Sequence, residues 1–164
     1  MVSENDAGMG HPAHPKPLPP VLADVDALHL EYLRFMDKDR RLEAAARAGI
    51  NLGAVERQAR ECGARLVVLC GSFAKGSEHP DSDVDIVYEP GPGSRGDFMV
   101  ESGTGVPVDM HSFNQLGPHS RADVLLTGTP LYEAEPGIFW SARADAIKYM
   151  LSARQAMHGA GVDR

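Results

Sequence analysis

Apolar residues recur at helical spacing over the first part of the chain. This spacing predicts a helix, or two, over residues 24–48, with Gly49 as the C-terminal stop. The apolar positions are Val25, Leu28, Tyr32, Phe35 and Met36. Asn51 is placed to cap a second helix over residues 52–62, which Gly63 would end. The pattern therefore predicts a helical region followed by a shorter amphipathic helix.

Two strands are predicted next, and they differ in pattern. Residues 65–70 form a nearly continuous apolar run, which is typical of a buried strand. In the following strand Val84 and Ile86 alternate with Asp83 and Asp85. Because side chains alternate faces along a strand, the two aspartates should share one face while the apolar pair points into the core.

A hairpin is the prediction for the middle of the chain. The segment 90–96 is too rich in Pro and Gly for a regular helix. Residues 97–101 and 106–113 read as strands joined by a turn over 102–105. Pro107 suits only the start or the edge of a strand.

Two further helices are predicted toward the C-terminus. Ser120 and Asp123 resemble a capping box that opens a short helix, and residues 128–130 would end it. Pro136 is placed to open the last helix, whose stripe is typical of a core face and consists of Phe139, Ala142, Ala146, Met150 and Met157.

Composition indicates a soluble chain with one core. Of 164 residues, 43% are hydrophobic and 24% charged, as in ordinary globular proteins. No stretch approaches the roughly 18 apolar residues of a membrane span, and no signal peptide is apparent, so we expect a cytoplasmic protein without membrane contact. Cys62 and Cys70 are too few for a disulfide framework, so we expect both to be small buried hydrophobic residues.

The net negative charge disfavours nucleic acid as a partner. The chain has 16 basic against 23 acidic residues, a formal charge of −7. Proteins that hold a long nucleic acid usually present a basic surface, so we expect no direct nucleic-acid binding. His11 and His14, in the proline-rich start of the chain, lack the further ligands that a metal site needs.

The candidate chemistry lies where the first predicted strand ends. Small residues at Gly71 and Ser72 allow backbone N–H groups to approach an anion, and a phosphate is the obvious one. A short helical turn over residues 73–76 would direct its N–H groups at it. Asp83 and Asp85, side by side, are best tolerated with a divalent cation between them, for which Mg²⁺ is the natural choice.

These residues carry a resemblance to a known family. The pattern of Gly71-Ser72, ten residues and then Asp83-x-Asp85 resembles the signature of the DNA polymerase β-type nucleotidyltransferases. Within that superfamily the chain is similar to minimal nucleotidyltransferase (MNT) antitoxins of HEPN/MNT toxin–antitoxin pairs. The same motif is matched by Lys75, Gly76 and Ser82, and Asp109 fits the third carboxylate of the family.

The resemblance implies an α/β (α+β) nucleotidyltransferase fold, a small mixed sheet backed by helices. It also implies Asp83, Asp85 and Asp109 as catalytic ligands of two Mg²⁺ ions, and Gly71, Ser72, Lys75 and Ser82 as nucleotide-binding residues. The implied reaction moves AMP from ATP to a tyrosine of a cognate HEPN ribonuclease toxin. Lys75 is otherwise an ordinary solvent lysine.

His111 should share a strand face with Asp109 by the period of two. It would orient a substrate or move a proton, or simply hydrogen-bond at the edge of the site. Two other functions stay open: a nucleotidyltransferase acting on a small molecule such as an aminoglycoside, and an antitoxin that neutralises by binding alone. Many members of the family have a helix between their second and third strands, which residues 90–96 cannot form. The cover of the site, and so the substrate, therefore stays open.

The predicted organisation has four parts. Residues 1–20 hold five prolines and no hydrophobic period, which predicts a disordered tail. Residues 21–50 form a helical extension that packs on the domain or faces a partner. The nucleotidyltransferase domain is predicted over 51–158, and 159–164 as a flexible C-terminal tail.

Overall fold

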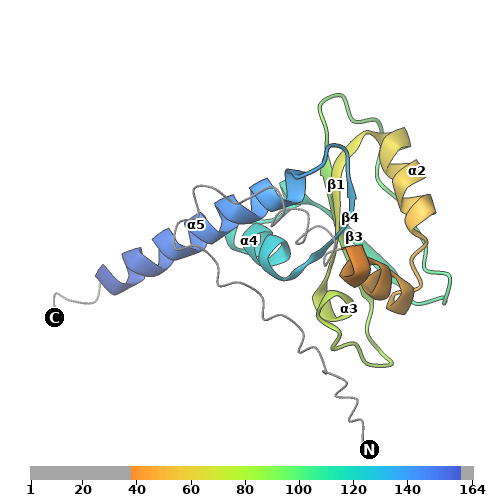
Figure 1. Ribbon diagram of the computed structural model, residues 1–164, viewed down its shortest axis with the longest axis horizontal. Helices are drawn as coiled ribbons and strands as arrows, with labels where there is room; N and C mark the ends of the chain where they lie inside the picture. Colours follow the sequence, from red (N-terminus) through yellow and green to blue (C-terminus); the bar gives the residue numbers. More distant parts are fainter. Residues whose placement is uncertain (1–37, 160–164) are drawn as a thin grey trace, which may run out of the picture.

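A computed structural model describes residues 38–159 of the chain (Figure 1). The predicted tail over 1–20, the upstream part of the extension and the chain beyond residue 159 lie outside the described residues. The remainder of the extension is helical over 38–47, and Gly49 follows with φ of 65°. The predicted stop at Gly49 is confirmed.

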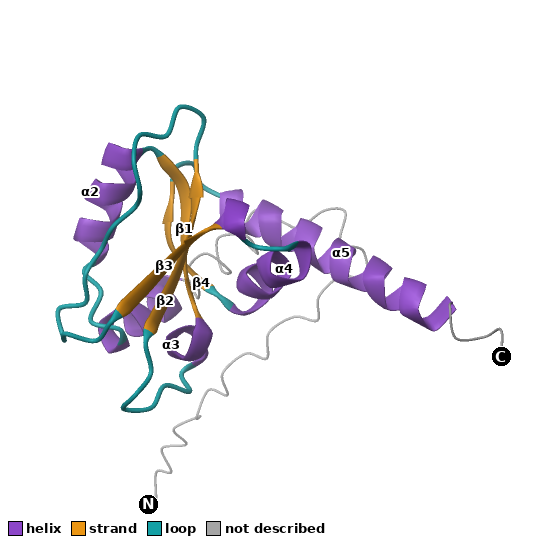
Figure 2. Cartoon of the chain, turned by 180° about the vertical axis from the view of Figure 1, so that it is seen from behind, coloured by secondary structure: helices purple, strands orange, loops and turns teal. Residues whose placement is uncertain are grey.

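The sheet has four strands in the order β3-β2-β1-β4 (Figure 2). Its central strand β1 (Ala64–Cys70) pairs antiparallel with β2 (Val84–Pro90) and with β4 (Thr129–Glu133). β2 pairs parallel with β3 (Val108–Ser112). The predicted small mixed sheet is therefore confirmed.

Helices cover both faces of this sheet. On one side lie the helix over 38–47 and α2 (Leu52–Cys62), and on the other α4 (Pro118–Thr127) and α5 (Ile138–Gly159) (Figure 1). The side chains of β1 alternate between two cores. Because both faces are covered, β1 is buried at every position from Leu66 onward and reads as an apolar run.

The caps of α2 are those predicted. The Asn51 side chain accepts a hydrogen bond from the Ala54 N–H at 3.0 Å, and Gly63 closes the helix with φ of 74°. Val55 and Ala59 face the core and are fully buried, while Leu52 is partly buried against it. This helix leads directly into β1.

The predicted hairpin is wrong. Residues 97–101 form no strand, and β3 instead runs parallel to β2 after an irregular connection over 91–107. Because β2 and β3 are parallel, the chain must cross back along the sheet between them, and the whole of 91–107 serves as this connection. Phe98 faces inward at 1% exposure and packs against Tyr88 with ring centroids 5.7 Å apart. The apolar residues of this segment thus pack against the core without strand pairing.

The strand predicted over 106–113 is shorter than expected and lies at the edge of the sheet. Pro107 precedes β3, and its carbonyl accepts a hydrogen bond from the Val84 N–H at 2.9 Å. A proline at the start of an edge strand loses no hydrogen bond of the sheet. The position predicted for Pro107 is confirmed.

The capping box predicted at Ser120 and Asp123 is also wrong. α4 begins at Pro118, with Gly117 as the N-cap and no side-chain capping bond. Proline fixes φ near the helical value and needs no hydrogen bond at the first helical position, so the helix starts there and Ser120 lies inside it. The helix ends at Gly128, as predicted.

α5 is 22 residues long, and only its first part belongs to the core. Phe139 is fully buried and Ala146 is 6% exposed, whereas Leu151 and Met157 are 57% and 69% exposed. The helix runs on beyond the body of the domain (Figures 1 and 2). The predicted core stripe is therefore confirmed only up to Ala146. None of the helices between residues 38 and 159 combines the length and apolar character needed to cross a bilayer.

Candidate functional site

The site begins where β1 passes into α3 (Gly71–Lys75). Gly71 has φ of 65°, in the left-handed region that favours glycine. A β-carbon at this position would collide with the Oδ2 oxygen of Asp85. The pairing of Cys70 with Asp85 across β1 and β2 produces this close approach. Gly71 is therefore required both by the backbone and by the neighbouring carboxylate.

The predicted acidic residues lie near one end of β2 and β3. Asp85 and Asp109 are register partners in the parallel pair. Asp83 lies two positions before Asp85 and directly precedes β2, which begins at Val84 and not, as predicted, at Asp83. Directly paired residues on neighbouring strands project to the same face of a sheet. Asp85 is partly buried, while Asp83 and Asp109 are exposed.

The crowding of these carboxylates changes the acidity of Asp85. Burial raises the pKa of the Asp85 carboxyl, and the negative charges of Asp109 and Asp83 raise it further, while His111 opposes them. The His111 Nε2 lies 3.0 Å from the Asp109 Oδ2. The predicted common face of Asp109 and His111 is confirmed by this contact.

The residues present fit a hard divalent cation by their chemistry. Across residues 38–159, no three His, Cys, Asp or Glu side chains are arranged closely enough to form a metal site. Asp83, Asp85 and Asp109 nevertheless offer the oxygen donors that Mg²⁺ prefers. A cation here would relieve the like-charge repulsion that raises the pKa of Asp85. Their role as ligands stays a prediction.

The structure places the other predicted residues around the same turn. Ser72 and Lys75 lie on α3 with Gly71, and Lys75 is exposed at its last position. Ser82 immediately precedes Asp83, and its hydroxyl oxygen accepts a hydrogen bond from the His79 N–H at 2.9 Å. Nucleotide contacts by these residues stay predictions, and the contact of Ser82 braces the loop before β2.

Cys70 borders the site without offering a nucleophile. Its thiol is buried, and burial together with the charge of Asp85 raises its pKa to about 12. A thiol of that acidity is protonated at neutral pH and unreactive. The expected role of Cys70 as a small buried hydrophobe is confirmed.

Arg47 also lies in this region, but it belongs to no motif and was not predicted from the sequence. Arg47 donates a hydrogen bond to the Phe73 carbonyl at 2.9 Å, and its Nε lies 3.1 Å from Glu78 Oε1. It comes from the helical extension, 26 positions before Phe73. The only available signal is the run of alanines around it, at 44–46 and 48, which favours close helix packing.

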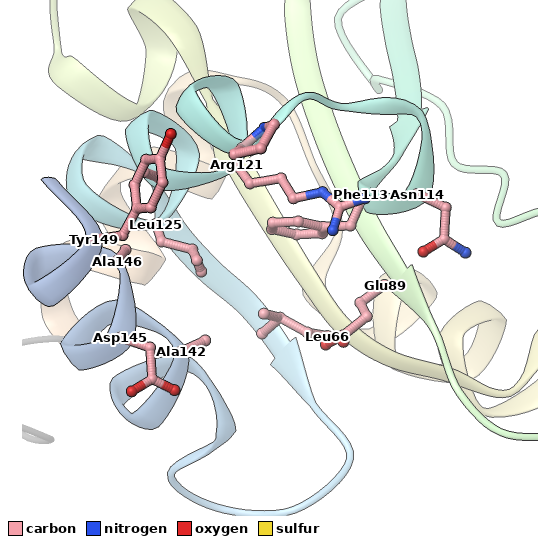
Figure 3. Close-up of a pocket in the computed structure, with 12 residues that line it drawn as sticks. Leu66, Glu89, Phe113, Asn114, Arg121, Leu125, Ala142, Asp145, Ala146 and Tyr149 are labelled. Atoms are coloured by element: carbon pink, nitrogen blue, oxygen red, sulfur yellow. The ribbon is translucent and has the colours of Figure 1, made fainter. Parts of the chain in front are cut away.

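A separate pocket of about 380 Å³ lies on the face covered by α4 and α5. Figure 3 shows its apolar floor, with Leu66 and Phe113, and polar side chains that include Arg121, Asp145 and Tyr149. None of the seven predicted site residues lines it. The pocket and the carboxylate site are therefore distinct.

Comparison with known proteins gives one family match. The nucleotidyltransferase domain family matches residues 55–132, which include Gly71, the three aspartates and all four strands up to Tyr132. Comparison with curated protein sequences gave no match.

Several solved structures are similar to this chain. A chain of a crystal structure of a toxin–antitoxin complex with AMP-PNP is 18% identical, with a TM-score of 0.49, and the match covers 70% of this chain and 97% of that one. A chain of a MntA–HepT toxin–antitoxin complex is 16% identical, with a TM-score of 0.42, and the match covers 65% of this chain and 89% of that one. A chain of a complex of tri-AMPylated Shewanella oneidensis HEPN toxin with MNT antitoxin is 14% identical, with a TM-score of 0.42, and the match covers 76% of this chain and 96% of that one.

Proposed function

We propose that this chain, a nucleotidyltransferase by its domain over residues 55–132, moves AMP from ATP to a hydroxyl group of a partner protein. The observation that supports it most is the convergence of Gly71 with Asp85 and Asp109, on three neighbouring segments of one sheet edge. A phosphate chain held at Gly71 would lie against the carboxylates. The reacting phosphorus and the cation ligands would thus lie in one place.

Each residue then has a role in binding. The backbone N–H groups at Gly71 and Ser72 would hold the β- and γ-phosphates that leave as pyrophosphate, with Lys75 adding a positive charge. Asp83, Asp85 and Asp109 would hold two Mg²⁺ ions. When bound, the ions neutralise charge on the entering and leaving oxygens of an in-line displacement.

The chemical step needs a base. The hydroxyl oxygen of the acceptor forms a bond to the α-phosphorus of ATP, and the bond from that phosphorus to the pyrophosphate oxygen breaks. The hydroxyl proton passes to the Asp109 carboxylate, which is exposed and therefore accessible to an incoming acceptor. His111, 3.0 Å from Asp109, orients that carboxylate.

The acceptor that we propose is a tyrosine of a HEPN-type toxin, which AMP transfer would silence. This rests on the resemblance of the motif from Gly71 to Asp109 to MNT antitoxins. The protein would then be an antitoxin that acts as an enzyme. An aminoglycoside-type acceptor and neutralisation by binding alone are the alternatives that the experiment below separates.

The test uses the purified chain, ATP with Mg²⁺ and a HEPN toxin encoded beside it. Intact-mass spectrometry should show the toxin gaining one or more AMP groups. Asp109→Asn keeps the side-chain volume but removes the charge that accepts a proton, so it should bind the toxin and add no AMP. Asp145→Asn, an exposed aspartate of α5 that is away from the carboxylate site, is the matched control and should act like the parent.

Other outcomes would favour a different function. Full protection of cells by Asp109→Asn, with no mass change of the toxin in the parent, would support neutralisation by binding. AMP transfer to an aminoglycoside and none to the toxin would support the small-molecule enzyme. Addition of Mg²⁺ with ATP should also raise the melting temperature of the parent, and Asp83→Ala with Asp85→Ala should abolish that shift.

A further inference from the structure

Arg47 connects the helical extension to the turn that follows Gly71. Its guanidinium donates to the Phe73 carbonyl at 2.9 Å and pairs with Glu78 at 3.1 Å. A β-carbon at Gly76 would lie 3.7 Å from an Arg47 nitrogen, so the guanidinium also covers the backbone of Gly76. One side chain thus contacts α3 at Phe73 and the following loop at Glu78, and lies close to the backbone of Gly76.

The Phe73 carbonyl needs such a partner. In a longer helix it would accept from the N–H of Ser77, four residues on. Here α3 ends after five residues, and the N–H groups of Gly76 and Ser77 both bond to the Ser72 carbonyl, the latter at 3.0 Å. Arg47 therefore satisfies a carbonyl that the helix end leaves open, and places a positive charge at the negative end of the helix.

Glu78 depends on Arg47 in the same way. Its side chain is 24% exposed, and the Oε2 oxygen is buried without a hydrogen-bond partner among the described residues. The Oε1 oxygen is held by Arg47. Removing Arg47 would leave a poorly solvated carboxylate close to the acidic site, and burial of an unpaired charge is costly. The loop would be expected to open so that Glu78 reaches water.

The loop from Glu78 to Asp83 transmits this hold to the site. The Ser82 N–H donates to the His79 carbonyl and the His79 N–H donates to the Ser82 hydroxyl, each at 2.9 Å. These bonds close residues 79–82 into a compact turn. Fixing Glu78 at one end of that turn therefore fixes where Asp83 enters β2 at the other.

From these contacts we propose that Arg47 is a positioning residue for nucleotide binding, holding residues 71–83 in the shape that the phosphates and the cation require. The proposal rests on the function proposed above. Arg47 acts from the helical extension, which begins upstream of the matched family domain. The extension would thus complete the nucleotide site in addition to packing on the domain.

The geometry requires arginine at this position. Two different nitrogens of the guanidinium make the two contacts, with Nε on Glu78 and an Nη on Phe73. A lysine ammonium is a single point charge and can serve one of these partners well, but not both in the same geometry. Arg47→Lys should therefore recover only part of what Arg47→Ala loses.

The first experiment compares ATP binding and AMP transfer. Arg47→Ala should raise the Kd and KM for ATP about tenfold, the loss expected for a charge-assisted hydrogen bond, and Arg47→Lys should fall in between. We expect kcat to change by less than about threefold, because Arg47 does not touch the reacting atoms. Arg60→Ala is the control, since Arg60 pairs with Glu56 on the exposed side of α2, and it should match the parent.

Hydrogen exchange tests the positioning itself and needs no ATP. Peptides covering residues 72–83 should exchange about tenfold faster in Arg47→Ala, while peptides from β1 and α2 keep the parent rates. Failure of the parent to bind ATP would overturn the proposed function alone. Unchanged exchange in this loop, or an Arg47→Ala variant that binds ATP as tightly as a parent that does bind it, would overturn the role of Arg47.

Discussion

Gly71 and Asp85 lie so close that the carboxylate of one occupies the space where the other would carry a β-carbon. The contact joins the end of β1 to the interior of β2, at the point where phosphate and cation ligands would meet. It makes the identity of residue 71 depend on a side chain of the neighbouring strand. Comparing Gly71→Ala with an alanine at another left-handed glycine separates that dependence from ordinary backbone strain.

Gly71→Ala should destabilise the domain by more than the backbone alone explains. Gly93 has φ of 75° and open space around it, so Gly93→Ala measures the strain of a left-handed alanine, about 1–2 kcal/mol. Gly71 has φ of 65° and adds the collision with Asp85. Urea denaturation of both variants should show a clearly larger loss for Gly71→Ala. Equal losses would mean that Asp85 moves aside freely.

Asp85→Asn should raise stability at neutral pH. Because the folded-state pKa of Asp85 lies above its ordinary value of 3.8, the folded chain binds the proton more tightly than the unfolded chain. Stability from this group is then greatest at low pH and is lost as pH rises through the window between those two values. Removing the charge should raise the melting temperature at pH 7, without divalent cations.

The gain in melting temperature from Asp85→Asn should shrink below about pH 4, because there the Asp85 carboxyl of the parent is protonated in both the folded and the unfolded chain. Asp145→Asn, on the exposed side of α5, serves as the control. Melting curves from pH 3 to 8 measure both. A variant less stable than the parent at pH 7 would contradict the prediction.

Phe98→Ala should cost about 3–5 kcal/mol of unfolding free energy, as expected for a large side chain removed from a core. Phe98 is 1% exposed although its segment has no regular structure. The neighbouring Met99 is 61% exposed, and Met99→Ala should change stability by no more than about 0.5 kcal/mol. Chemical denaturation measures the unfolding free energy of both variants. A small loss for Phe98→Ala would mean that the connection over 91–107 is not packed against the core.

Cys70 should resist thiol reagents in the folded chain. With a pKa of about 12, only about one molecule in ten thousand carries the thiolate at pH 8, and the sulfur is buried. In a Cys62→Ser background, labelling by a chromogenic disulfide should be complete in urea and negligible without it. Fast labelling of the native protein would show that the site is more open than the structure indicates.

Local signals were sufficient for much of the fold. Asn51 and Gly63 fix the ends of α2, because capping depends on residues within one turn. The period of two placed Asp109 beside His111, since neighbours on one strand face need no knowledge of the partner strand. Position along the chain therefore predicted the shared strand face of Asp109 and His111, whereas the place of Asp109 beside Asp85 was implied by the family resemblance.

Other features depend on partners that spacing does not reveal. The apolar residues around Phe98 indicated a strand, yet the place beside β2 is taken by β3, and a hydrophobic pattern says nothing about which strand pairs or in which direction. Arg47 bonds to a carbonyl 26 positions away that is open only because α3 is so short. In both cases the identity of the partner cannot be predicted from spacing along the chain.

The placement of β1 at the centre of the sheet has a consequence for biosynthesis. Its first neighbour, β2, begins at residue 84, but the strand on its other side is not made until residues 129–133. During translation the nascent sheet therefore passes through an interval in which β1, apolar on both faces, has one open edge. Such an edge pairs readily with other chains. Ribosomes that stall between these two strands would release the form of this protein most prone to aggregate.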